Sequence, residues 1–193
     1  MGWVQWLSFI TGLIYIYYAS AQQSRCWPWG IISSGLWAYA SWFDMRLLSD
    51  SILQMIYVVL GIWGWYAWSN PKKITTIPVT KMSIRDLSFS ILCSLVLSAL
   101  LGWYMTTMEA AFPILDATLT IFSITATILL IQQKIENWLF WILIDWVSVP
   151  VFMMRGGYLF AILFVIYGIL AIKGWYNWSA IIKNSLTVQH HQS

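Results

Sequence analysis

Apolar residues run in seven long stretches along the 193-residue chain, separated by short breaks of polar residues or proline. A membrane-spanning helix needs about 20 mostly apolar residues, and each stretch is close to that length. We therefore predict seven spanning helices, at Trp6 to Ala21, Trp27 to Phe43, Ser51 to Trp68, Leu87 to Tyr104, Phe112 to Ile131, Trp138 to Met154 and Tyr158 to Trp178.

The composition agrees with this pattern, because 60% of the residues are apolar and only 9% are charged. Soluble domains carry roughly a quarter charged residues. The sequence predicts an all-α integral membrane protein with a single transmembrane domain over residues 1–193, surrounded by the lipid bilayer. The formal charge of +3 does not indicate nucleic acid, because the basic residues flank apolar stretches.

Lys and Arg in short loops are retained on the cytoplasmic side of a membrane. An outside N-terminus places all basic residues inside except Arg46 and Arg155. We therefore expect the N-terminus outside and residues 180–193 as a cytoplasmic tail.

The first three predicted spans resemble the last three. GWYAWS from Gly64 matches GWYNWS from Gly174, Trp29 pairs with Trp138, and Tyr57 pairs with Tyr167. One helix is left between the repeats, so both repeats have the same orientation in the bilayer, and a substrate site is expected between them near the midplane. The predicted boundaries are about 6–69 for the first repeat, 87–104 for the connecting helix and 112–179 for the second repeat.

The sixth span carries one carboxylate, Asp145, in an otherwise apolar sequence. At a rise of about 1.5 Å per residue it lies roughly 10 Å into the hydrocarbon core, where an acid costs about 3 kcal/mol. Trp138 and Trp141 precede it at helical spacing and share its face. This wall favours a flat, positively charged ligand, because aromatic faces and a carboxylate both attract cations. A polar contact with a neighbouring helix is the simpler alternative.

Other polar and aromatic residues complete the predicted substrate site. Gln54 has an amide that lipid cannot satisfy, and Tyr57 lies one turn further along the same face. The remaining members of the predicted site are Tyr167, Ser33, Trp37 and Asp116.

Catalytic and metal-binding patterns point to no site in the spans. Both histidines lie in the C-terminal tail, and the two cysteines are far apart. We therefore expect no metal site, no cofactor and no enzymatic activity.

The sequence ENWLFWILIDWVSVPVF from Glu136, the paired GWYxW segments and the repeat resemble the PnuC family of bacterial vitamin transporters. This resemblance implies a SWEET-like arrangement in the bacterial inner membrane and uptake of a vitamin by facilitated diffusion. It further implies trapping of the vitamin by a cytoplasmic kinase, and a homo-oligomer such as a trimer.

Two departures from the nicotinamide riboside branch bear on the substrate. That branch has WxxWxxxN in the sixth span, whereas this chain has WxxWxxxD, and Ser33 stands where the branch has an Asn. Both features are closer to the branch associated with thiamine, which becomes the expected substrate. Nicotinamide riboside is the alternative, and a non-transporting membrane scaffold subunit is an alternative of another class.

Overall fold

The computed structural model describes residues 2–44, 48–69, 79–107, 112–154 and 156–190. These residues form helices and short connections with no β-strand, apart from an isolated bridge between Thr80 and Lys134. The segment that carries Asp145 is helical from Asn137 to Met154. Arg46 and Arg155, on which the predicted orientation partly depends, lie outside the described residues.

The helices follow the predicted spans closely. They are α1 (Trp3–Ser20), α2 (Cys26–Tyr39), the π-helix η1 (Ala40–Asp44), α3 (Leu48–Ser69), α5 (Ile84–Thr106), α6 (Pro113–Ile131), α7 (Asn137–Met154) and α8 (Tyr158–His190). Helix α8 continues past the predicted end of the span at Trp178, through the predicted tail as far as His190.

Five helices among the described residues are long and apolar enough to cross a membrane. The two that fall short are α2, with 14 residues before the π-helix, and α1, whose aromatic residues are mixed with Gln5, Ser8 and Thr11. The protein is thus an all-helical, multi-pass membrane protein. The qualifying segments are Asp50–Ser69, Ile84–Thr106, Pro113–Ile131, Asn137–Met154 and Tyr158–Ser185.

The chain divides into two compact units, and each is described by itself. The first unit holds Met1–Pro78 and Tyr176–Ser193, and the second holds Val79–Trp175. Helix α8 contributes its first part to the second unit and its last turns to the first unit.

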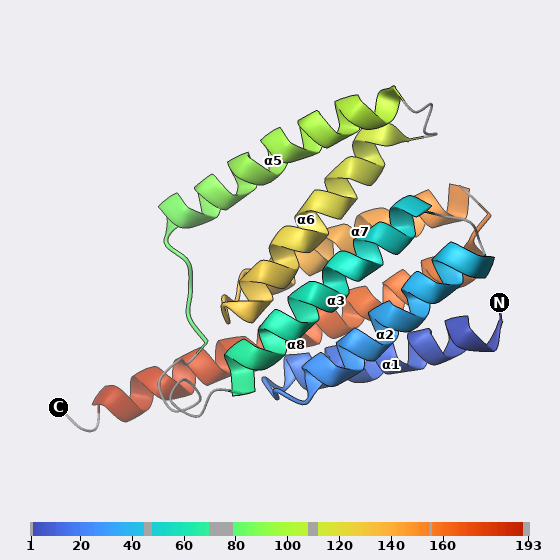
Figure 1. The fold of residues 1–193 in the computed structure, drawn as a ribbon. Coiled ribbons are helices and arrows are strands. Elements are labelled where there is room, and N and C mark those ends of the chain that lie inside the picture. The colour runs from blue at the N-terminus through green and yellow to red at the C-terminus, as the bar shows by residue number, and fades with distance from the viewer. Residues whose placement is uncertain (1, 45–47, 70–78, 108–111, 155, 191–193) are drawn as a thin grey trace. The chain divides into compact units, whose positions relative to one another are not determined.

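In the first unit α1, α2 and α3 lie side by side (Figure 1). Ser8 and Ser33 join α1 to α2 reciprocally, because each hydroxyl donates to the backbone carbonyl of the other residue at 2.8 Å. Such hydroxyl contacts are common between membrane helices. At the far end of α1, the last turns of α8 are anchored by Trp178, whose indole N–H donates to the Ala19 carbonyl at 3.2 Å.

The turn between α1 and α2 recurs between α6 and α7. Gln22 and Gln133 have φ angles of 55° and 56°. Their backbone N–H groups donate to the carbonyls of Ala19 and Leu130, both at 3.0 Å. Counted from these two glutamines, the residue equivalent to Trp138 is Trp27. The structure therefore pairs Trp27, and not the predicted Trp29, with Trp138.

The glycine of each GWY segment receives the ring of a tryptophan. A Cβ at Gly64 of α3 would lie 2.4 Å from the Trp27 ring, and a Cβ at Gly174 of α8 would lie 2.6 Å from the Trp138 ring. Both rings are buried, at 1% and 2% exposure. We call these two contacts the Trp–Gly contacts. They explain why the motif needs a residue without a side chain at this position.

In the second unit α5 packs on α6 through a row of small residues, Ser94, Ser98 and Gly102, which are the buried residues of α5. The Ser94 and Thr125 hydroxyls are 2.8 Å apart, and a Cβ at Gly102 would lie 3.1 Å from Ile114 Cα. Small residues let helix backbones approach closely. Figure 1 shows the two helices converging at this end and separating toward the start of α5.

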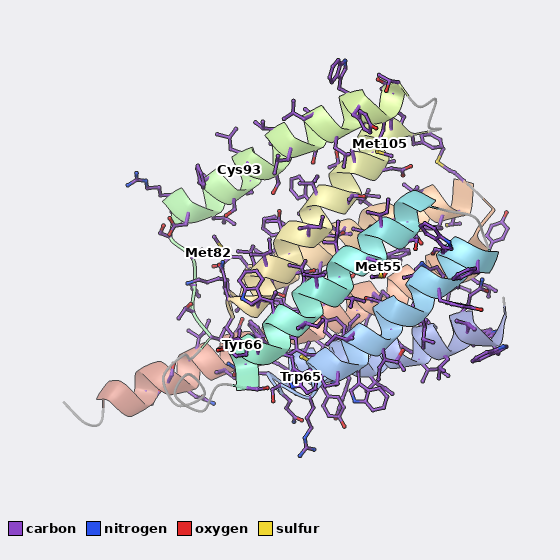
Figure 2. The ribbon with its side chains drawn as sticks, in the orientation of Figure 1. Met55, Trp65, Tyr66, Met82, Cys93 and Met105 are labelled. Atoms are coloured by element: carbon purple, nitrogen blue, oxygen red, sulfur yellow. The ribbon has the colours of Figure 1, made fainter. Side chains whose placement is uncertain are left out.

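The linker Val79–Ser83 leads into α5 and is bound to the turn between α6 and α7. Thr80 accepts from the Ile135 amide and donates to the Gln133 carbonyl, both at 3.1 Å. Two side chains add to this: Lys134 Nζ donates to Thr80 Oγ1 at 3.0 Å, and Glu136 accepts from the Met82 amide at 2.9 Å. Figure 2 labels Met82 on this linker, and Cys93 and Met105 further along α5.

Candidate functional site

Asp145 lies midway along α7 and is 3% exposed. Among the described residues none donates a hydrogen bond to its carboxylate. Ser148, one turn further, gives its hydroxyl to the Ile144 carbonyl at 2.7 Å and so serves its own helix. A buried carboxylate without a protein donor needs water, a proton or a cationic ligand to offset its lost hydration.

Tyr167 of α8 is brought close to Asp145, near enough for an electrostatic interaction between the two side chains. Its ring meets Phe164 edge to face at a centroid distance of 6.3 Å, and Phe164 stacks on Phe152 of α7 at 5.1 Å. Carboxylate, phenol and aromatic rings thus gather between α7 and α8. The second unit brings together two of the predicted site residues in this way.

The two tryptophans that precede Asp145 have different surroundings. Trp138 is packed on Gly174 as described above, so its ring is buried against the backbone of α8. Trp141 is half-buried and packs against a cluster formed by Ala126 and Leu129 of α6 with Phe140 and Ile144 of α7. The predicted stacking wall therefore has one partly accessible indole in this structure, and the role of Trp138 in stacking stays a prediction.

Gln54 and Tyr57 belong to α3 in the first unit and are both half-buried. Within the described part of the chain, the Gln54 amide has no hydrogen-bond partner, which leaves it available to a ligand. Tyr57 lies near Tyr15 of α1. Tyr15 was not predicted, because nothing in the sequence separates it from Tyr17 and Tyr18, which lie in the same span.

Ser33 and Trp37 of α2 take part in contacts inside the first unit. Ser33 bonds to Ser8, and the Trp37 indole N–H donates to Asp50 Oδ2 of α3 at 2.8 Å. Ser41 of the π-helix also donates to Asp50 Oδ2. Asp50 therefore links α2, η1 and α3. The contacts of Ser33 and Trp37 join helices of the first unit, and a role of either residue in substrate binding stays a prediction.

Replacing Asp50 by Ala is expected to lower the free energy of unfolding by about 1–3 kcal/mol, because two donors lose a charged acceptor. The measurement is the apparent melting temperature in detergent. Trp37→Phe removes one of the two bonds and serves as the graded comparison, with a smaller expected decrease. An unchanged melting temperature for Asp50→Ala would contradict this role.

Asp116 is half-buried in the first turn of α6. An acid at this position interacts favourably with the helix dipole. Its place at a helix end, and not in the middle of a span, separates it from Asp145. No group of three or more His, Cys, Asp or Glu that could hold a metal occurs in the part of the chain that the structure describes.

The arrangement around Asp145 is suited to binding and not to bond cleavage. It offers a buried carboxylate, a phenol and a partly accessible indole, a combination that attracts a flat cation. The carboxylate sits in the middle of a helix that can cross a membrane. A ligand held there is held at membrane depth.

Known proteins resemble the chain over almost its whole length. The profile of a family described as "Nicotinamide mononucleotide transporter" matches residues 2–180. The nicotinamide riboside transporter PnuC of Escherichia coli (strain K12) is 27% identical over 98% of this chain and 91% of its own length. The riboflavin/roseoflavin transporter RibM of Streptomyces davaonensis is 24% identical over 91% of this chain and 84% of its own.

A solved structure shows the same fold. The crystal structure of the vitamin B3 transporter PnuC superimposes with a TM-score of 0.77 at 20% identity, covering 94% of this chain and 83% of that one. The names of these three proteins refer to nicotinamide riboside, riboflavin and vitamin B3. Thiamine is not among them.

Proposed function

The chain belongs to the family of nicotinamide mononucleotide transporters, and from this we propose that it carries a cationic vitamin, nicotinamide riboside, across the membrane by facilitated diffusion. Its relatives are membrane transporters and not enzymes. The named substrate of the Escherichia coli relative supports nicotinamide riboside over thiamine, the substrate predicted from the sequence.

The buried carboxylate of Asp145 carries the proposal. An acid in the middle of a span costs about 3 kcal/mol, which a positive ligand in the same low dielectric can offset. The pyridinium ring of nicotinamide riboside is a flat, permanent cation. It would pair with Asp145, lie against the half-buried Trp141 and meet the Tyr167 hydroxyl.

Thiamine is the second candidate, because Asp145 stands where the nicotinamide riboside branch has an Asn. Its thiazolium is also a cation. The other departure, Ser33, supports thiamine less, since the Ser33 hydroxyl is engaged with Ser8. Riboflavin, named for one relative, has a neutral ring system and gives the carboxylate no charge to pair with.

The finer layout of the transporter belongs to the same proposal. The repeated turn at Gln22 and Gln133 and the two Trp–Gly contacts support two three-helix repeats joined by α5, hence seven spans. We further propose the inner membrane with the N-terminus outside, a homo-oligomer, and trapping of the vitamin by a cytoplasmic kinase.

Uptake by purified protein in liposomes tests the proposed substrate. Nicotinamide riboside, thiamine and riboflavin are supplied at equal concentration. The expected result is saturable transport of nicotinamide riboside, both into and out of the liposomes, without an ion gradient. Entry of thiamine alone would replace the leading candidate by the second. Entry of none, with no quenching of tryptophan fluorescence, would favour the scaffold alternative.

A further inference from the structure

A slot of about 290 Å³ lies between the first turns of α5 and the last turns of α6. It exists because the row of small residues holds the two helices together at one end and they separate toward the other (Figure 1). The linker with Met82, labelled in Figure 2, closes the third side. At about 30 Å³ per water, the slot has room for about ten water molecules, or a small polar group.

Two side chains of opposite charge line this slot. Lys134 uses one ammonium proton to bond Thr80 Oγ1 at 3.0 Å, and Asp86 Oδ2 accepts from the Ser83 hydroxyl at 2.8 Å. An ammonium has three donors and a carboxylate has two oxygens, so each residue keeps bonding capacity. The pair matches a ligand with one positive and one negative group.

The rest of the lining is amphipathic. Ser90 and Thr125 bring hydroxyls, whereas Phe89 and Ile128 bring apolar surface. Phe89 is 67% exposed on α5, a helix apolar enough to cross a membrane. The slot therefore opens beside the surface that α5 presents to lipid, with its charged residues at the helix ends, where headgroups lie.

We propose that this slot binds a membrane phospholipid whose headgroup carries both an ammonium and a phosphate. The phosphate meets Lys134, the ammonium meets Asp86, and an acyl chain follows Phe89 along α5. Arg85, exposed in the first turn of α5, adds attraction for the phosphate layer. The site lies apart from Asp145 in sequence and chemistry, and it predicts a lipid preference that the transport site does not require.

Native mass spectrometry of the detergent-purified protein tests the proposal with three lipids that share their acyl chains. These are a phosphatidylethanolamine, a phosphatidylcholine and a phosphatidylglycerol. The expected result is about fivefold stronger retention of the ethanolamine lipid, a modest factor because partly exposed ion pairs are weak. The choline lipid lacks ammonium protons for Asp86, and the glycerol lipid lacks the positive charge.

Variants separate the two charges. Lys134→Gln is expected to lower retention of the ethanolamine lipid, and Asp86→Asn to abolish its advantage over the choline lipid. Lys81→Gln, at an exposed lysine that does not line the slot, is the matched control and should keep the preference. Equal retention of all three lipids by the unmodified protein, or strongest retention of phosphatidylglycerol, would overturn the proposal.

Soluble phosphoethanolamine distinguishes a lipid from a free phosphate ester. If it fails to displace the bound lipid, the acyl chains are part of the recognised ligand, as proposed. Displacement at millimolar concentration would assign the slot to a free phosphate ester and overturn the lipid assignment. Circular dichroism of each variant confirms that a loss of binding is not a loss of fold.

Discussion

Replacing Asp145 by Leu should lower the affinity for nicotinamide riboside by about ten- to a hundredfold. Leu has a similar size but no charge and no hydrogen-bonding group, and a hydrogen bond or ion pair to a charged group is worth about 1.5–3 kcal/mol. Quenching of tryptophan fluorescence measures binding, and uptake into liposomes measures transport. The variant should fold normally, because removing a buried charge lowers a desolvation cost.

Ser148→Ala is the matched control for this change. Ser148 lies one turn from Asp145 and its hydroxyl serves the Ile144 carbonyl, so we expect binding to be retained. The same pair of variants, measured with thiamine, shows whether Asp145 selects between the two vitamins. Nicotinamide riboside binding that is unchanged in Asp145→Leu would remove this residue from the site.

Replacing Gly174 by Ala is expected to lower the free energy of unfolding by about 1–3 kcal/mol, the usual cost of overpacking. The new Cβ would lie 2.6 Å from three atoms of the Trp138 ring, so ring or backbone must shift. Gly64→Ala should have a similar effect, because its Cβ would lie 2.4–2.5 Å from Trp27. The apparent melting temperature in detergent measures both.

Gly35→Ala is the control for these two variants. A Cβ at Gly35 meets nothing within 4 Å, and Ala favours a helix over Gly by about 1 kcal/mol, so stability should hold or rise. Adding Trp138→Phe to Gly174→Ala replaces the indole by a smaller ring and should recover part of the lost free energy of unfolding. If all three glycine variants melt at the same temperature, the Trp–Gly contacts are not tight.

The positions of the helices could be predicted from the sequence because apolar length sets them, and the structure moves most ends by only a few residues. The exception is α8, which continues to His190 after its apolar stretch ends. Hydropathy marks where a helix enters water but not where it stops being helical. Backbone hydrogen bonds continue there without any apolar side chains.

The candidate site was predictable in part. The depth of Asp145 follows from counting along one helix, and the repeat suggested Tyr167, which the structure places nearby. The contacts of Ser33 and Trp37 were not predictable, because helical spacing gives the face of a residue but not its partner. Their partners, Ser8 and Asp50, lie on other helices.

The hydrogen bonds of Thr80 and Met82 to the turn between α6 and α7 have a mechanical consequence. Four bonds at about 0.5–1.5 kcal/mol each resist separation of these segments. If this turn tilts during a transport cycle, the beginning of α5 must move with it. The hinge that permits such a tilt therefore has to lie outside the segment from Thr80 to Met82.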